Sequence, residues 1–124
     1  WRAGRFFFEL DQYWRWMKEL AALFPGKQVR FLVLSDEALP DLSAHFSVVT
    51  DNGGPEATQW QPLFDIVRFS LCDYIMGPPS SFSRTAAFLG DRPLLVLRSK
   101  AQTIDLRDCV VPDDLNEDEA LRYL

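Results

Sequence analysis

The chain has 124 residues, which fits a single domain, and 48% of them are hydrophobic and 25% charged, a balance that supports a folded core and excludes a disordered chain. Its formal net charge of −5 excludes broad, non-specific nucleic-acid binding, which needs a basic surface, but it permits a small anionic ligand. No run approaches the ~20 apolar residues that cross a membrane, and no signal peptide is visible, so we expect a protein of the cytoplasm.

The first half of the chain is expected to form one helix and two strands. Apolar residues recur at helical spacing over residues 10–24, and Pro25-Gly26 ends the run. The continuous β-prone run 29–35 is typical of a buried parallel strand, and residues 46–50 form a second β-prone run. A short helix or loop separates these strands, and a turn-rich loop follows the second one.

The second half alternates helices with strands. Thr58 caps an expected helix with apolar residues on one face, and another helix begins at Ser80 or Ser81 and ends at Gly90, where a C′ glycine belongs. We expect strands at 73–77 and 92–99, a short fifth strand at 108–112 and a last helix from 116. Apolar strands that alternate with helices predict an α/β fold, a Rossmann-like layered domain with a mainly parallel sheet of four or five strands and helices on both faces.

Cysteine and histidine usage limits the chemistry. Cys72 and Cys109 lie far apart without a CxxC spacing, which indicates buried thiols of an intracellular protein rather than a disulfide. His45 is the only histidine, so we expect neither a metal cluster nor a Ser–His–Asp set.

Polar residues follow three of the expected strands, at the ends where open α/β sheets bind ligands. They are Ser35, Asp36 and Glu37 after the first strand, Thr50 and Asp51 after the second, and Ser80, Ser81 and Ser83 after the third. The third set lies at a helix N-terminus, whose free N–H groups and dipole favour a diphosphate, although serines here also act as simple helix caps. Asp36 and Glu37 could likewise bind a ligand or cap the next helix, and Asp65 could form an ion pair with Arg68.

In their order, these segments resemble the donor-binding half of fucosyltransferases with the GT-B architecture, the alpha-one-two and alpha-one-six fucosyltransferase families. The shared motifs are Ser35-Asp36-Glu37 at a strand end, Asp65-Ile66 with Ser70 and Cys72 on a helix, and Ser80-Ser81-Phe82-Ser83 before a helix. The resemblance covers residues 5–97 and implies that residues 1–124 are one donor-nucleotide-binding domain from a longer, two-domain glycosyltransferase.

The resemblance also implies how GDP-fucose would bind, without a metal or another cofactor. Asp65 would accept hydrogen bonds from the guanine base, and the Ser35-Asp36-Glu37 segment would face the ribose or the sugar. The β-phosphate would be held by Ser80, Ser81 and the backbone N–H groups of Phe82 and Ser83.

Two features of that family are absent from this chain. The family's His-x-Arg-Arg-Gly-Asp-like segment, whose arginine neutralises the leaving diphosphate, does not occur here, and neither does an acceptor domain. We therefore expect an inactive fragment of an enzyme that transfers a sugar to a glycan, with no residue that suits the catalytic base. Arg84 in the first turn of its helix could supply replacement positive charge.

Two further expectations depend on this interpretation. If the absent segment held the central strand, the sheet could close up, or the chain could form a homodimer through the exposed sheet edge. The alternative to the transferase is a non-catalytic α/β binding or interaction module, in which the serines only cap a helix and Asp65 only pairs with Arg68.

Overall fold

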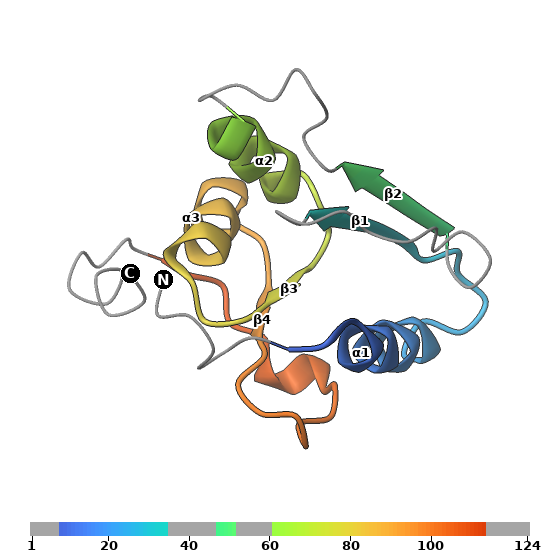
Figure 1. Cartoon of the computed structure of the whole chain (residues 1–124). Coiled ribbons are helices and arrows are strands. Elements are labelled where there is room, and N and C mark those ends of the chain that lie inside the picture. The colour runs from blue at the N-terminus through green and yellow to red at the C-terminus, as the bar shows by residue number, and fades with distance from the viewer. Residues whose placement is uncertain (1–7, 35–46, 52–60, 114–124) are drawn as a thin grey trace.

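The computed structural model describes residues 8–34, 47–51 and 61–113 (Figure 1). In chain order its elements are α1 (Leu10–Ala22), β1 (Arg30–Leu34), β2 (Ser47–Asp51), α2 (Gln61–Ser70), β3 (Ile75–Gly77), α3 (Ser81–Gly90), β4 (Leu94–Val96) and the 3-10 helix η1 (Leu106–Asp108). These positions agree with the expected alternation of helices and strands to within a few residues at each end. The expected Thr58 cap, the connection at 36–46 and the last helix lie outside the described residues.

The four strands pair in parallel, as the apolar runs predicted. Within the described ranges they form two separate two-stranded sheets, β1 with β2 and β3 with β4, rather than one sheet of four or five strands. In the first sheet Arg30 pairs with Ser47, and in the second Ile75 pairs with Leu94. The parallel α/β class is therefore established, and the single sheet stays a prediction.

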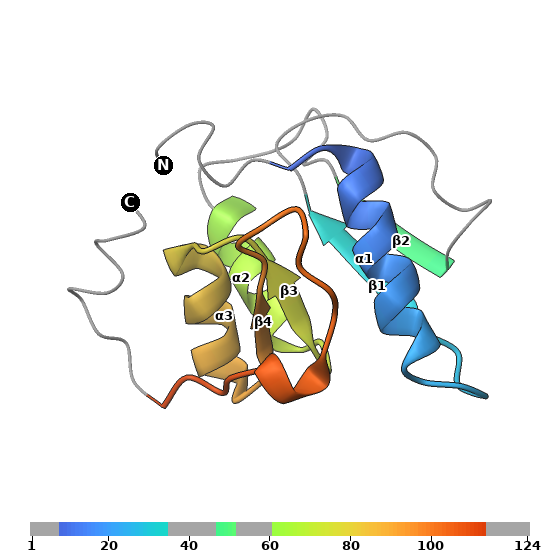
Figure 2. The ribbon, with the colours of Figure 1, turned by 90° about the horizontal axis from the view of Figure 1, so that it is seen from below.

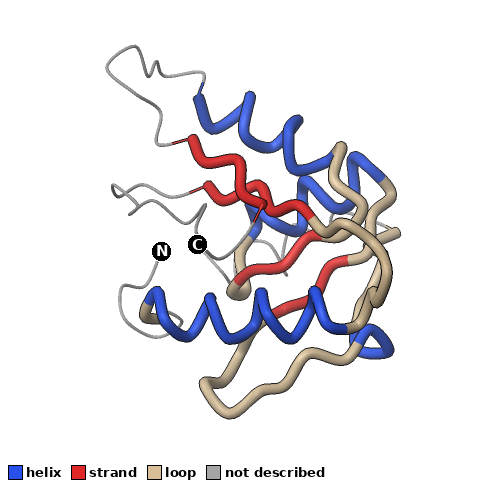
Figure 3. The backbone as a smooth tube through the Cα atoms, turned by 90° about the vertical axis from the view of Figure 1, so that its right-hand side faces the viewer, coloured by secondary structure: helices blue, strands red, loops and turns tan. Residues whose placement is uncertain are grey.

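Helices cover both faces of the β3–β4 sheet. Leu94 packs with Ala86 and Ala87 of α3, whereas its neighbour Leu95 packs in a different cluster with Trp16 of α1. Adjacent residues of a strand point to opposite faces, so the sheet separates α1 from α3. Figures 1 and 3 show the same layering, with the strands between α1 on one side and α2 and α3 on the other.

The core beside α1 is aromatic. Trp16 is completely buried, and the rings of Phe8 and Tyr13 meet it edge-on with centroids 5.0 and 5.5 Å away. Such edge-to-face pairs add about 1 kcal/mol each to the burial of the rings. Figure 2 shows α1 passing alongside β1 and facing the segment after β4.

The predicted end of α3 at Gly90 is confirmed, whereas the C′ role of Gly90 and the fifth strand were predicted wrongly. Gly90 is the last residue of α3, and Asp91 after it adopts the left-handed conformation, with φ 53° and ψ 48°. Gly90 is needed for another reason, because a Cβ there would collide with the backbone carbonyl of Ser70. The expected fifth strand is a single antiparallel bridge between Val110 and Leu94, closed by N···O distances of 2.7 and 3.0 Å.

Candidate functional site

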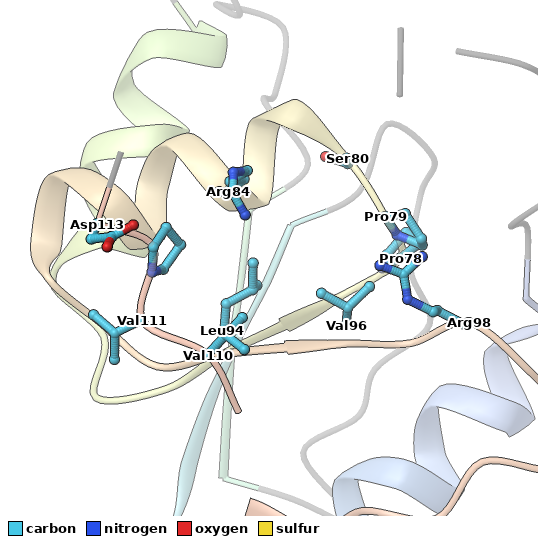
Figure 4. Close-up of a pocket in the computed structure, with 11 residues that line it drawn as sticks. Pro78, Pro79, Ser80, Arg84, Leu94, Val96, Arg98, Val110, Val111 and Asp113 are labelled. Carbon is cyan, nitrogen blue, oxygen red and sulfur yellow. The ribbon is translucent and has the colours of Figure 1, made fainter. Parts of the chain in front are cut away.

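A cavity of about 380 Å³ lies between α3 and β4 and reaches from Leu94, at the start of β4, to Pro78 and Arg98, past the carboxyl ends of β3 and β4 (Figure 4). Pro78, Pro79 and Ser80 line it from the turn after β3, and Leu94 and Val96 form its apolar floor. Its volume is within the range of small-molecule sites, and the end of it near Pro78 and Arg98 is where parallel α/β sheets bind ligands.

The turn between β3 and α3 has the geometry of a capped helix N-terminus. Ser80 has extended backbone angles, φ −160° and ψ 141°, and its Oγ accepts a hydrogen bond of 3.2 Å from the N–H of Ser83. The N–H groups of Ser81 and Phe82 lie in the first turn, where a helix offers no backbone acceptor. Ser80 therefore caps the helix, as expected. The N–H groups of Ser81 and Phe82 still point out of the N-terminal end of α3.

Ser83 is buried and lies against β3. Its Oγ is 3.1 Å from the position that a Cβ on Gly77 would occupy, so a glycine at the end of β3 lets α3 approach closely. Because the N–H of Ser83 already donates to Ser80, its expected bond to a phosphate would compete with the cap.

Phe82 connects the first turn of α3 to α2. Its ring meets the ring of Phe69 edge-on, with centroids 5.8 Å apart. Asp65 is four residues before Phe69 and so lies on the same face of α2, one turn nearer its start. Helices α2 and α3 therefore pack side by side, but Asp65 is not among the residues that line the cavity.

Asp65 also makes the ion pair that its spacing predicted. Its Oδ1 is 3.7 Å from Nη1 of Arg68, and the two side chains are 20% and 34% exposed. A helical i,i+3 pair of this kind contributes about 0.3 kcal/mol, so its loss would be a minor cost if a ligand took over the carboxylate. Ser35, Asp36 and Glu37 lie outside the described residues.

Two arginines line the cavity from different elements. Arg84 extends from α3, as expected for a residue in the first turns, and Arg98 extends from the segment after β4 (Figure 4). Sequence reasoning missed Arg98, and the available signal was its place directly after an apolar strand. A third charged residue, Asp113, lines the opposite end of the cavity.

The cysteines are free thiols, and both are half-buried. Burial raises the pKa of Cys72 and of Cys109, and the neighbouring carboxylates Asp73 and Asp108 raise them further. Neither thiol is activated as a nucleophile by its surroundings.

Within the described part of the chain there is neither a metal-binding cluster nor a helix that could cross a membrane. No group of three or more His, Cys, Asp and Glu side chains there could hold a metal ion. None of the helices in those ranges has the length and apolar character that crossing a membrane requires. No protein-family model matches the sequence, and no curated protein or solved structure is significantly similar to it.

Proposed function

We propose that this chain binds the diphosphate of a nucleotide sugar, with GDP-fucose as the first candidate, as the donor half of a GT-B glycosyltransferase that transfers the sugar to a glycan. One observation carries the proposal. The cavity lies between β4 and the first turns of a ten-residue helix, and its lining includes Ser80, Arg84 and Arg98.

The charges of the site support an anionic ligand. Guanidinium groups make short, often paired hydrogen bonds to phosphate oxygens, and the N-terminus of α3 adds the positive end of its dipole. The apolar floor of Leu94 and Val96 lowers the local dielectric constant and so strengthens these attractions. In this proposal Asp65 accepts hydrogen bonds from guanine, and the Ser35-Asp36-Glu37 segment contacts the ribose or the sugar.

The proposal includes a single Rossmann-like, mainly parallel sheet of four or five strands with helices on both faces. Its support is that Phe31 of β1 and Met76 of β3 pack against the same cluster around Trp16, although their strands are not hydrogen-bonded to each other. The alternative is a homodimer, in which the backbone N–H and C=O groups of the exposed sheet edges pair with a second copy of the chain. Sedimentation equilibrium of the full chain separates the two, because only the dimer changes mass with concentration.

A second candidate function is a non-catalytic α/β interaction module. The bond from Ser83 to the Ser80 hydroxyl and the ion pair between Asp65 and Arg68 favour it, because both give these residues structural partners. In this function the residues stabilise helices and recognise no ligand.

Thermal unfolding of the full chain with GDP or UDP distinguishes the candidates. A ligand that binds only the folded state raises the melting temperature in proportion to its affinity, so GDP should raise it and UDP should not. Asp65→Ala should remove this preference with little loss of stability, whereas the exposed Asp73→Asn, which removes the same charge, should keep it. Equal shifts with GDP and UDP would reject the guanine assignment, and no shift with either would favour the interaction module.

A further inference from the structure

We infer that Arg84 and Arg98 bind the two phosphates of a diphosphate across the cavity, and that Gln102 is the positioning residue that holds Arg98 there. This inference rests on the proposed function for the location of the ligand. Beyond that function, the site should prefer a diphosphate to a single phosphate, and Gln102, which lies outside the cavity, should set that preference.

The side chain of Gln102 fixes the backbone at the end of β4. Its Nε2 donates to the carbonyl of Val96 at 2.9 Å, and its Oε1 accepts from the N–H of Arg98 at 2.8 Å. One amide therefore bonds on both sides of Leu97, as the backbone of a neighbouring strand would. Leu97 is completely buried and its N–H donates to Gly77 at 2.8 Å, so the residue before Arg98 is held from two directions.

The backbone of Gln102 is in turn fixed to α1. Its carbonyl accepts from Trp16 Nε1 at 2.8 Å and from Arg15 Nη2 at 2.9 Å, and the same Arg15 nitrogen donates to Lys100 at 2.6 Å. Because Trp16 is buried in the aromatic core, the segment from Arg98 to Gln102 has a rigid support. A short turn at this place would not otherwise need so many bonds to a helix more than 80 residues away in sequence.

The position of the charges selects the ligand. Arg84 and Arg98 approach the cavity from different elements, and Figure 4 shows Asp113 at the end opposite Arg98, with Arg84 between them. We expect two linked phosphates to engage both guanidinium groups and a single phosphate to engage only one of them fully. The carboxylate of Asp113 repels an anion at its own end and so favours binding between the arginines.

Calorimetric titration of the full chain with inorganic pyrophosphate and with inorganic phosphate tests the inference. Pyrophosphate should bind at least about tenfold more tightly than phosphate, since a second charge-assisted contact contributes about 1.4 kcal/mol or more. Arg98→Gln should weaken pyrophosphate binding about tenfold and bring the two ligands closer together. Arg107→Gln, which removes the same charge from an exposed arginine outside the cavity, is the matched control and should change neither affinity.

A double-mutant cycle tests the role of Gln102. Gln102→Ala should weaken pyrophosphate binding in the wild-type background and add nothing to Arg98→Gln, because it acts only through that arginine. Gln102→Glu, which still accepts from Arg98 N–H but cannot donate to Val96, should retain part of the affinity and replaces the alanine variant if that variant unfolds. Equal losses in both backgrounds would show a purely structural role and overturn the inference.

The outcomes also separate this inference from the proposed function. Pyrophosphate binding that depends on Arg98, without any preference of the chain for GDP over UDP, would reject the guanine nucleotide and retain the diphosphate site. A GDP-specific rise in the melting temperature that Arg98→Gln leaves unchanged would retain the guanine nucleotide and reject the two-arginine diphosphate site. Failure of the full chain to bind pyrophosphate would overturn the inference.

Discussion

Helices α2 and α3 have ten residues each, yet they are held in the fold in different ways. In α3, Ala86 and Ala87 are completely buried against β3 and β4, and a serine caps the first turn. In α2, three large apolar side chains are exposed, namely Leu63, Phe64 and Val67, and so is Leu71 directly after the helix, with 72% of its surface in solvent. The same length and apolar character therefore give a helix fixed by a sheet in one case and a helix fixed mainly by its neighbour in the other.

This difference divides the candidate site into two parts. The cavity-lining residues Ser80 and Arg84 lie at the N-cap and in the first turn of α3, so the packing of α3 on the sheet determines their position. Asp65 belongs to α2, which is held to α3 through the Phe69–Phe82 ring pair and the close approach at Gly90. Diphosphate binding should therefore depend on the core of the domain, whereas base recognition should depend on the packing between the two helices.

The strongest test of this contrast is Gly90→Ala, which forces α2 and α3 apart. The new Cβ would collide with the Ser70 carbonyl, and its distance to the carbonyl carbon would be only 2.8 Å. Because neither neighbour is the end of a flexible side chain, we expect a loss of about 3 kcal/mol in the free energy of unfolding, measured by urea titration.

Gly26→Ala is the control for Gly90→Ala. Gly26 has φ of +77° but open space around it, so alanine there introduces backbone strain without a collision. It should lower stability by about 1 kcal/mol, and equal losses for the two variants would contradict the packing explanation.

Ser80→Ala and Ser80→Asp separate capping from phosphate binding. Alanine removes the acceptor for Ser83 N–H and should lower the free energy of unfolding by about 1 kcal/mol. Aspartate caps as well as serine and should keep stability within about 0.5 kcal/mol, while its charge repels pyrophosphate. Calorimetry that finds unchanged pyrophosphate affinity in Ser80→Asp would place the ligand elsewhere.

A substitution at the exposed Leu71, directly after α2, should have a smaller effect on stability. Leu71→Gln should change the free energy of unfolding by less than about 0.5 kcal/mol, because most of this side chain already contacts water. Urea titration is again the measurement. A loss above about 1 kcal/mol would mean that another segment covers this face of α2 in solution and would weaken the contrast with α3.

Much of the fold follows from apolar spacing. The helices at 10–22, 61–70 and 81–90 repeat apolar residues every three to four positions, and the strands lie in β-prone, mostly apolar runs. The division into two sheets could not be predicted, because such a run records burial on both faces and not the identity of the hydrogen-bonded neighbour. The Gly90 prediction failed for a related reason, since the Ser70 carbonyl that excludes a side chain lies 20 residues away in sequence.

The candidate site was only partly predictable. Ser80 and Arg84 were found because N-caps and first-turn charges are local signals that short sequence windows contain. Arg98 and Gln102 were not found, because their importance comes from α1, which is joined to Gln102 by hydrogen bonds across 86 and 87 residues. For Asp65 the sequence allowed two roles, an ion pair with Arg68 and a contact to a nucleotide, because both use the same carboxylate.

The smallest expected effect concerns η1, whose cap is charged and exposed where that of α3 is neutral and half-buried. Side-chain and backbone hydrogen bonds from Arg107 lower the pKa of Asp105 to about 2. A pKa lowered in the folded state stabilises the protein above the ordinary value of 3.8, and this contribution is lost as the pH falls toward 2. Arg107→Gln should therefore make stability less dependent on pH between 4 and 2 in urea titrations, whereas Asp108→Asn should not. Because the Asp105–Arg107 pair is exposed, its contribution should also fall as salt is added, and an unchanged pH dependence in Arg107→Gln at low salt would show that the pair does not form in solution.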